Sequence, residues 1–248
     1  MRRKQQKYSA NITVGGKELP VEVVFEHRWG HRYSISRKCI RMRLPLGLAA
    51  SEVQRHLTEL QQWVGKVAAK KTTLLEAFTP KTYRSGEVLA VGQRQYILDI
   101  AVEERGSHTG KLIGNTIALR LSSRVSEPQQ HKAIRTLLSR IVAGDFQTEI
   151  EQRVFAWNRR TFNRPIKGVF LKYNHSNWGS CSHNGNVNLS TRLLFAPPEV
   201  QDYVILHELA HLVELNHSDR FWSLVETFMP DYREREKWLS QFGGSCDF

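Results

Sequence analysis

The chain has 248 residues, of which 40% are hydrophobic and 10% aromatic, enough for a buried core in one or two domains. No apolar run approaches the ~18 residues of a membrane span, so we expect no contact with a membrane. The N-terminal segment lacks the apolar stretch of a signal peptide. Only three cysteines occur, which argues against a disulfide framework and predicts a reducing, cytoplasmic location.

The first part of the chain is predicted to be rich in β-strands. Short runs of β-prone residues are separated by Gly15-Gly16, by Gly92 and by Gly114-Asn115, which is typical of hairpins. A capping box at Ser51–Gln54 predicts the start of a helix. The expected elements are strands at 12–14, 21–25, 33–44, 87–91 and 95–102, a hairpin within 111–121, and a helix from 51 to about 70.

The second part is predicted to be mixed α and β, and no internal repeat stands out in the sequence. Gly144-Asp145 is expected to break or kink a long helix, which Pro165 ends. The expected elements are helices at 128–160, from 199 onward, at 219–228 and at 231–241, with strands at 166–173 and 186–193. We therefore expect an α+β protein with a boundary near residue 125, between a β-rich part (1–125) and a catalytic part (126–248).

The most informative motif is H-E-x-x-H at His207–His211, which is followed by His217. Two histidines four residues apart lie on one face of a helix, so both imidazoles can reach one zinc ion. Glu208 is rotated off that line and can take a proton from water at the open coordination position. Chance placement of these three histidines and the glutamate is on the order of 0.1%, so the pattern predicts a catalytic metal site.

His217 can join this site only if the helix ends first. Six further residues of helix would turn its side chain to the wrong side of the cylinder. We therefore expect the helix to end near Glu214 or Leu215, with Asn216 as a left-handed capping residue and Ser218 as the cap of the next helix. Glu214 and Glu226 remain alternative third ligands.

Four segments around this motif resemble the YgjP-like metal-dependent hydrolases, which are related to the SprT-like zincin metallopeptidases. The resemblance extends to two segments of the N-terminal part, and it is strongest from Trp178 to Trp222. It implies a zincin-like catalytic part with an active-site helix and a small antiparallel sheet. It also implies one zinc ion per chain, held by His207, His211 and His217, with Glu208 as base. The segments are 178–182 (WGSCS), 185–193 (GNVNLSTRL), 203–212 (YVILHELAHL), 216–222 (NHSDRFW), 36–45 (SRKCIRMRLP) and 85–92 (SGEVLAVG).

The same spacing of histidines occurs in the metzincins. Those enzymes place a glycine three residues after the second histidine, where this chain has Glu214, so we do not assign it to them.

The loop and strand before the motif supply candidate substrate contacts. The resemblance to zincins implies that the strand 186–193 is an edge strand that pairs with an extended substrate. Trp178 could form part of one wall of the cleft, and Asn188 and Arg192 could point into it. His183 could donate to an oxyanion or contact phosphate. Tyr232 is a candidate donor to the transition state, whereas Phe221 and Trp222 are expected to pack beneath the metal site.

A formal net charge of +12 favours anionic partners. One reading is nucleic acid bound at the basic surface; another is a nucleotide substrate, since some YgjP-like proteins carry the name of a UTP pyrophosphatase. No G-x-x-x-x-G-K-[ST] phosphate loop is present, so zinc and arginines would have to hold a nucleotide. The basic clusters are 2–4, 37–38 with Arg41 and Arg43, and 159–160 with Arg164 and Lys167, the last interleaved with Trp157 and Phe162.

We therefore predict a cytoplasmic zinc-dependent hydrolase. A metallopeptidase that acts on a polypeptide fits best, and a UTP pyrophosphatase that uses the same metal site is the alternative. A nucleic-acid-binding module with non-catalytic zinc fits less well, because structural zinc sites are usually closed, four-coordinate and rich in cysteine.

Overall fold

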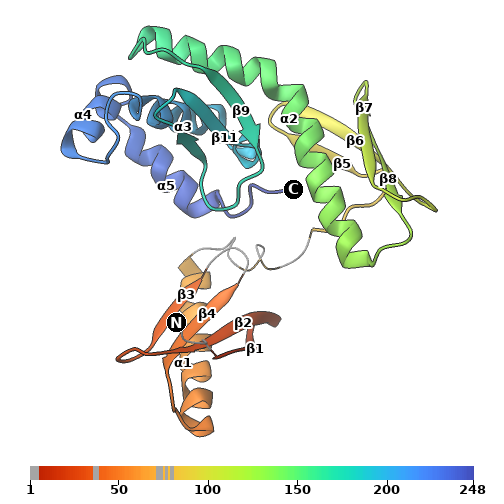
Figure 1. The fold of residues 1–248 in the computed structure, drawn as a ribbon, viewed down its shortest axis with the longest axis vertical. Helices are drawn as coiled ribbons and strands as arrows, with labels where there is room; N and C mark the ends of the chain where they lie inside the picture. Colours follow the sequence, from red (N-terminus) through yellow and green to blue (C-terminus); the bar gives the residue numbers. More distant parts are fainter. Residues whose placement is uncertain (1–5, 36–38, 71–74, 76–77, 79–80) are drawn as a thin grey trace. The chain divides into compact units, whose positions relative to one another are not determined.

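A computed structural model describes residues 6–35, 39–70, 75, 78 and 81–248. The chain divides into two compact units, Met1–Pro80 and Lys81–Phe248 (Figure 1). No helix among the described residues is long and apolar enough to cross a membrane. The predicted basic clusters at 2–4 and 37–38 lie outside the described residues.

The first unit is a four-stranded sheet with one helix packed against it. The strands are β1 (Gln6–Val14), β2 (Lys17–Glu26), β3 (Arg32–Ile35) and β4 (Ile40–Pro45), in the order β1-β2-β4-β3, and the helix is α1 (Ala50–Lys70). The β1–β2 and β3–β4 pairs are antiparallel, and β2 pairs with β4 in parallel. Alternate apolar side chains of the sheet pack on Leu60 and Val64 of α1, both completely buried.

The second unit opens with a sheet of the same topology. The strands are β5 (Val88–Val91), β6 (Arg94–Glu103), β7 (Thr109–Ile113) and β8 (Thr116–Ser122), in the order β5-β6-β8-β7. Again the outer pairs are antiparallel and the central pair is parallel. The helix α2 (Glu127–Arg160) follows, as α1 follows β4.

This repeated β-β-β-β-α topology was not expected from the sequence. The first hairpins of the two sheets correspond in register: Val14 pairs with Lys17, and Val91 pairs with Arg94. Gly15 and Gly92, which follow these valines, have positive φ, so each provides the tight turn at the same place. The amino-acid sequences of the two sheets otherwise have little in common, because each sheet needs only alternating apolar residues and a few glycines in its turns.

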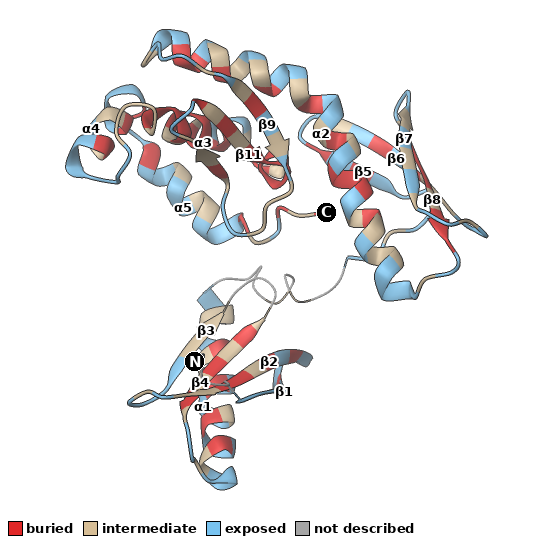
Figure 2. Ribbon diagram, in the orientation of Figure 1, coloured by how far each residue is buried: buried red, intermediate tan, exposed pale blue. Residues whose placement is uncertain are grey.

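The rest of the second unit carries the motif. Three strands form the order β10-β11-β9, and they are accompanied by a 3₁₀ helix and three α-helices. These elements are β9 (Gly168–Lys172), β10 (Gly179–Cys181), β11 (Asn186–Ser190), the 3₁₀ helix η2 (Thr191–Phe195), α3 (Pro198–Ala210), α4 (Asp219–Phe228) and α5 (Tyr232–Phe242). Most of α3 is buried, and α3 shares one hydrophobic core with β9, β11 and α2 (Figure 2).

The α+β class is confirmed, with three differences. The small sheet is mixed, because β11 pairs antiparallel with β10 but parallel with β9. The predicted strand 33–44 is two strands, β3 and β4, which pair with each other. The division between the two compact units falls after residue 80, and the boundary expected near 125 lies inside the second unit, where β7 and β8 pack on α2.

Two helix starts also differ from expectation. Helix α1 begins one residue before Ser51, and Ala49 caps it through its backbone N–H, which donates to the Glu52 carboxylate at 3.0 Å. Helix α2 begins with a capping box of Ser126 and Gln129 and runs unbroken past Gly144-Asp145. Asp145 accepts hydrogen bonds from Arg94 and Tyr96 instead of ending the helix.

Candidate metal centre

Helix α3 places the motif in its last turn. Prolines at 197 and 198 stand where a helix start tolerates the missing N–H, and buried residues such as Val200 and Leu206 fix the helix in the core. His207 and Glu208 lie in the final turn, and His211 is the C-terminal cap. The helix therefore ends at Ala210, four or five residues before the predicted end near Glu214 or Leu215.

The turn after α3 brings the chain back to the helix end. The backbone N–H groups of Leu212 and Val213 donate hydrogen bonds to the carbonyls of Leu209 and Ala210. These bonds span three residues, as in a 3₁₀ helix, and they tighten the last turn. Among the described residues Asn163 is the non-glycine residue with positive φ, so the predicted left-handed cap at Asn216 is wrong. Ser218 caps α4 as predicted, accepting a hydrogen bond from the Phe221 N–H at 3.3 Å.

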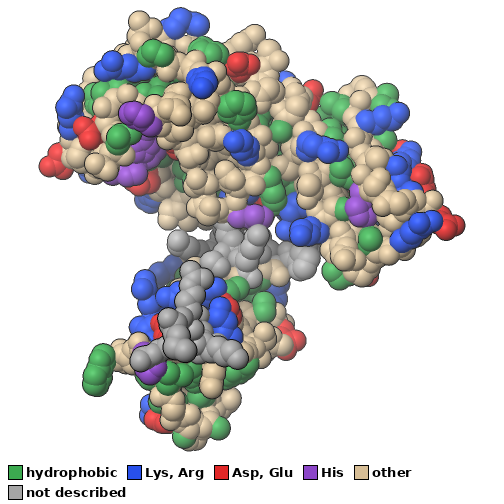
Figure 3. Space-filling model, in the orientation of Figure 1, with side chains coloured by type: hydrophobic (Ala, Val, Ile, Leu, Met, Phe, Trp, Pro, Cys, Tyr) green, Lys and Arg blue, Asp and Glu red, His purple; other side chains and the backbone are tan. Residues whose placement is uncertain are grey.

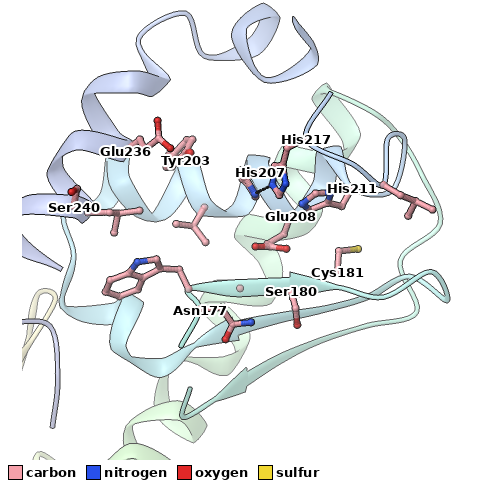
Figure 4. Close-up of a pocket in the computed structure, with 15 residues that line it drawn as sticks. Asn177, Ser180, Cys181, Tyr203, His207, Glu208, His211, His217, Glu236 and Ser240 are labelled. Atoms are coloured by element: carbon pink, nitrogen blue, oxygen red, sulfur yellow. Dashed lines mark hydrogen bonds between the residues drawn. The ribbon is translucent and has the colours of Figure 1, made fainter. Parts of the chain in front are cut away.

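His207, His211 and His217 converge on one point. One ring nitrogen from each lies within 4.8 Å of the others, and the Nε2 atoms of His207 and His217 are 3.0 Å apart. The imidazoles point toward one another in Figure 4. Neither Glu214 nor Glu226, the alternative third ligands, belongs to this group among the described residues.

The surroundings orient His211 and lower the pKa of two of the three imidazoles. His211 Nδ1–H donates to the Glu214 carbonyl at 3.1 Å, which leaves Nε2 as the free lone pair. Burial, and then the neighbouring histidines, lower the pKa of His207 to about 3. Burial also lowers the pKa of His211. Convergent imidazoles are a donor set that suits a divalent transition metal, so these three residues fit such an ion.

Aromatic rings support the histidines from below, as the sequence predicted. Phe221 is completely buried, and its ring centroid lies 4.6–4.9 Å from those of His207, His211 and His217. Trp222 stacks on His217 at 5.7 Å. This packing limits the rotation of the imidazoles.

Glu208 is buried between α3 and β10. A β-carbon on Gly179 would lie 2.6 Å from the Glu208 Oε1 and Cγ atoms, so the carboxylate occupies space that another residue at 179 would fill. The backbone N–H of Cys181 donates to the carboxylate. Burial nevertheless dominates and raises the pKa of Glu208 from 4.5 to about 8, which is where a general base works best near neutral pH.

The strand beside Glu208 is the edge of its sheet. The resemblance to zincins implied that the strand 186–193 would be this edge, but β11 is central and β10 is outermost. Ser182 N–H binds the Asn186 carbonyl and Ser190 N–H binds the Trp178 carbonyl, so the even-numbered residues pair with β11. In an antiparallel ladder the alternate residues, Gly179 and Cys181, then turn their backbone groups away from β11.

The three histidines and Glu208 open into a cleft of about 680 Å³. Three of its lining residues were not predicted from the sequence. Tyr203 lies one turn before His207 on α3, and Glu236 and Ser240 come from α5, which is distant in the sequence. Among the described residues that line it there is no lysine or arginine. The lining residues are Asn177, Trp178, Gly179, Ser180, Cys181, Tyr203, Val204, His207, Glu208, His211, Leu215, His217, Glu236, Leu239 and Ser240.

Of the predicted substrate contacts, Trp178 alone borders this cleft. Asn188 turns its Nδ2 toward Ser180 on the neighbouring strand, and His183 is exposed outside the cleft. Tyr232 is buried against Tyr203 and Trp222 rather than directed at the histidines.

Arg192 is only 1% exposed and serves the C-terminal segment. Its Nε donates to the Cys246 carbonyl at 2.8 Å and its Nη2 to the Gly243 carbonyl at 2.9 Å. The guanidinium also stacks beneath the Trp178 ring at 4.4 Å. The prediction that Arg192 reaches into the cleft was wrong, because these carbonyls hold the guanidinium inside the core.

The aromatic residues of the last basic cluster are not free to stack on bases. Trp157 is buried and donates its Nε1–H to Asp202, while Arg160 covers its ring at 3.6 Å. Phe162 packs edge-on against Phe228. On the face drawn in Figure 3, lysine and arginine side chains are spread over the surface rather than gathered in one stripe.

This chain is similar to a solved structure and to a described protein family. The metallopeptidase zymogen of Pyrococcus abyssi abylysin, a solved structure, is 25% identical over 38% of this chain and 94% of that chain, with a TM-score of 0.34. No match was found among curated proteins. Residues 31–242 match the family described as YgjP-like, metallopeptidase domain, which covers both the cleft and the histidines. The chain therefore belongs to the YgjP-like family of metallopeptidase domains.

Proposed function

We propose that the chain is a zinc-dependent peptidase in which His207, His211 and His217 hold one ion and Glu208 is the general base. The observation that carries this proposal is a buried carboxylate with a raised pKa beside three convergent imidazoles that line the same cleft. Three protein ligands leave a position for water, as catalytic zinc sites do.

The chemistry divides between the ion and the carboxylate. When bound, zinc supplies Lewis-acid polarisation of water and of the scissile carbonyl, and its charge favours ionised Glu208. Glu208 then accepts the proton of the attacking water at a carboxylate oxygen and delivers it to the departing amide nitrogen. The Cys181 N–H and the close fit against Gly179 hold the carboxylate in place for both transfers.

The open edge of β10 supports a polypeptide as the substrate. The backbone carbonyls of Gly179 and Cys181, together with the Gly179 N–H, face away from β11 and can pair with an extended chain. An extended peptide added there would run alongside Glu208. Trp178, Val204 and Leu239 would contact its side chains.

The composition of the cleft is a reason to prefer peptides over nucleoside triphosphates. A triphosphate requires cationic side chains to neutralise it, and the described lining residues include two acids, Glu208 and Glu236, with no lysine or arginine. The high net charge lies elsewhere on the surface. A peptide backbone needs no such cations.

The decisive experiment compares zinc-loaded wild type and Glu208→Gln on an unfolded polypeptide and on nucleoside triphosphates. We expect wild type to cleave the polypeptide, and Glu208→Gln to keep its zinc while losing roughly 10³-fold or more of the rate. Glu226→Gln, which changes an exposed carboxylate on α4 outside the histidine group, is the matched control and should retain activity.

Two results would contradict the proposal. Release of pyrophosphate that depends on Glu208, with the polypeptide left intact, would make the chain a nucleotide hydrolase. Full activity of a zinc-bound Glu208→Gln protein would remove Glu208 from the mechanism. A His211→Ala protein reports the metal separately, because it should lose zinc and activity together.

A further inference from the structure

A second group of metal-ligating side chains lies in the first unit, away from the motif in the sequence. His31 directly precedes β3, and His56 and Glu59 are three residues apart on one face of α1. One ligand atom from each of these three residues lies within 4.8 Å of the others. The ring centroids of His31 and His56 are 4.7 Å apart.

Tyr33 orders the two ligands on the helix. Its hydroxyl donates to Glu59 Oε2 at 3.0 Å and also lies 3.0 Å from His56 Nδ1. His56 Nδ1 is itself 3.1 Å from Glu59 Oε2. Tyr33 thus holds the carboxylate and the imidazole side by side on α1.

The three residues differ in exposure in a way that suits binding from solvent. His56 is only 8% exposed, whereas Glu59 and His31 are exposed, and the His31 ring stacks on Tyr33 at 4.7 Å. His56 and Glu59 are thus held in place by α1, and the exposed His31 side chain can move toward an ion bound between them. Arg55 is the cation that faces Glu59, at 3.8 Å, and its side chain is 65% exposed and able to turn away.

We propose that His31, His56 and Glu59 bind a divalent transition-metal ion, at a site distinct from the one at His207. Two imidazoles and a carboxylate are a donor set that suits zinc, nickel, copper or iron and that Mg²⁺ and Ca²⁺ disfavour. The hydroxyl of Tyr33 orients the coordinating carboxylate, the usual role of a group behind a metal ligand.

The ion would fasten the segment between β2 and β3 to α1. Of the three ligands, only His31 belongs to that segment, in which Trp29 is fully exposed. Metal binding would therefore fix the position of this segment on the helix, and it would stabilise the fold of the first unit.

The test uses the full chain, stripped of metal and titrated with Zn²⁺ by calorimetry and with Co²⁺ by its visible absorption. We expect two ions per wild-type chain. The His207→Ala/His211→Ala double variant removes the first site, and it should keep one ion. Adding His31→Ala or Glu59→Gln to that background should weaken the remaining site tenfold to a hundredfold or more. His27→Ala, an exposed histidine outside the group, is the matched control and should leave both sites intact.

Two outcomes overturn the inference. One is a double variant that binds no ion while its circular dichroism matches wild type. The other is a second ion whose affinity is unchanged by both His31→Ala and Glu59→Gln. If the double variant does not fold, the same question is answered in the wild-type background, where His31→Ala should lower the stoichiometry from two ions to one. None of these readouts measures peptidase activity, so the proposed function and this inference fail separately.

Discussion

Glu208 and Gly179 are in such close contact that a β-carbon at position 179 would lie 2.6 Å from the Glu208 Oε1 atom. Glycine at this position is therefore a requirement of the candidate base, although the two residues are far apart in sequence. The contact also brings the carboxylate to the open edge of β10, where a substrate backbone would pair.

The first prediction concerns this contact. Gly179→Ala should displace the Glu208 carboxylate while leaving the three histidines in place, because the added methyl group meets Glu208 and not the imidazoles. We expect kcat for the polypeptide to fall by about 10²-fold, with one zinc retained at this site. Gly106→Ala is the control, since nothing lies within 4 Å of a β-carbon there. Loss of zinc together with activity would show instead that the substitution disturbs the metal ligands.

The second prediction concerns Arg192 as a structural residue. Arg192→Leu removes the hydrogen bonds that the guanidinium donates to the carbonyls of Gly243 and Cys246, and it removes the cation under the Trp178 ring. We expect the free energy of unfolding to drop by about 3–5 kcal/mol, measured by urea denaturation. A substrate-binding arginine would behave differently, with unchanged stability and a raised KM.

The third prediction is a pH dependence of stability in the metal-free protein. Burial raises the pKa of Glu208 from 4.5 to about 8, so between these values the folded state holds a proton that the unfolded chain has released. Glu208 therefore favours the folded state most at low pH, and this contribution is lost as the pH rises through 8. Glu208→Gln removes the effect.

The free energy of unfolding of Glu208→Gln minus that of wild type should increase by roughly 2–4 kcal/mol when the pH is raised from 4.5 to 8. Urea denaturation of both proteins, stripped of metal and measured at each pH, gives this difference while other titrating groups cancel. A difference that stays constant with pH would mean that Glu208 ionises in the folded protein as it does in the unfolded chain.

The local features of the site could be predicted from the sequence, because they depend on neighbouring residues. The spacing of His207 and His211 needs only helical geometry, and the turn that returns His217 follows from the same periodicity. The cap at Ser218 is likewise set within one turn of helix. Errors there were confined to where α3 ends and to the capping role of Asn216.

Features that depend on distant segments could not be predicted. The alternation of residues in 186–193 is the same whether the strand is central or at an edge, so the exposed position of β10 was missed. Arg192 is charged, and only its fold-specific contacts with the C-terminal carbonyls keep it buried. The repeated sheet topology is hidden for a similar reason, since strand pairing constrains the pattern of apolar residues more than their identities.

The last prediction concerns substrate preference. The cleft is lined by two acidic residues, Glu208 beside the histidines and Glu236 farther along. Glu236 lies next to Tyr203 and Ser240 (Figure 4). With no lysine or arginine among the described lining residues to compensate it, this carboxylate should favour peptides that place a basic side chain near it. We expect a peptide with arginine there to have a kcat/KM several-fold higher than the matched peptide with glutamate, and Glu236→Gln to reduce this ratio toward one. Glu234→Gln, an exposed carboxylate on the same helix that does not line the cleft, should leave the ratio unchanged. Equal discrimination by wild type and Glu236→Gln would show that side chains of the substrate do not reach this wall.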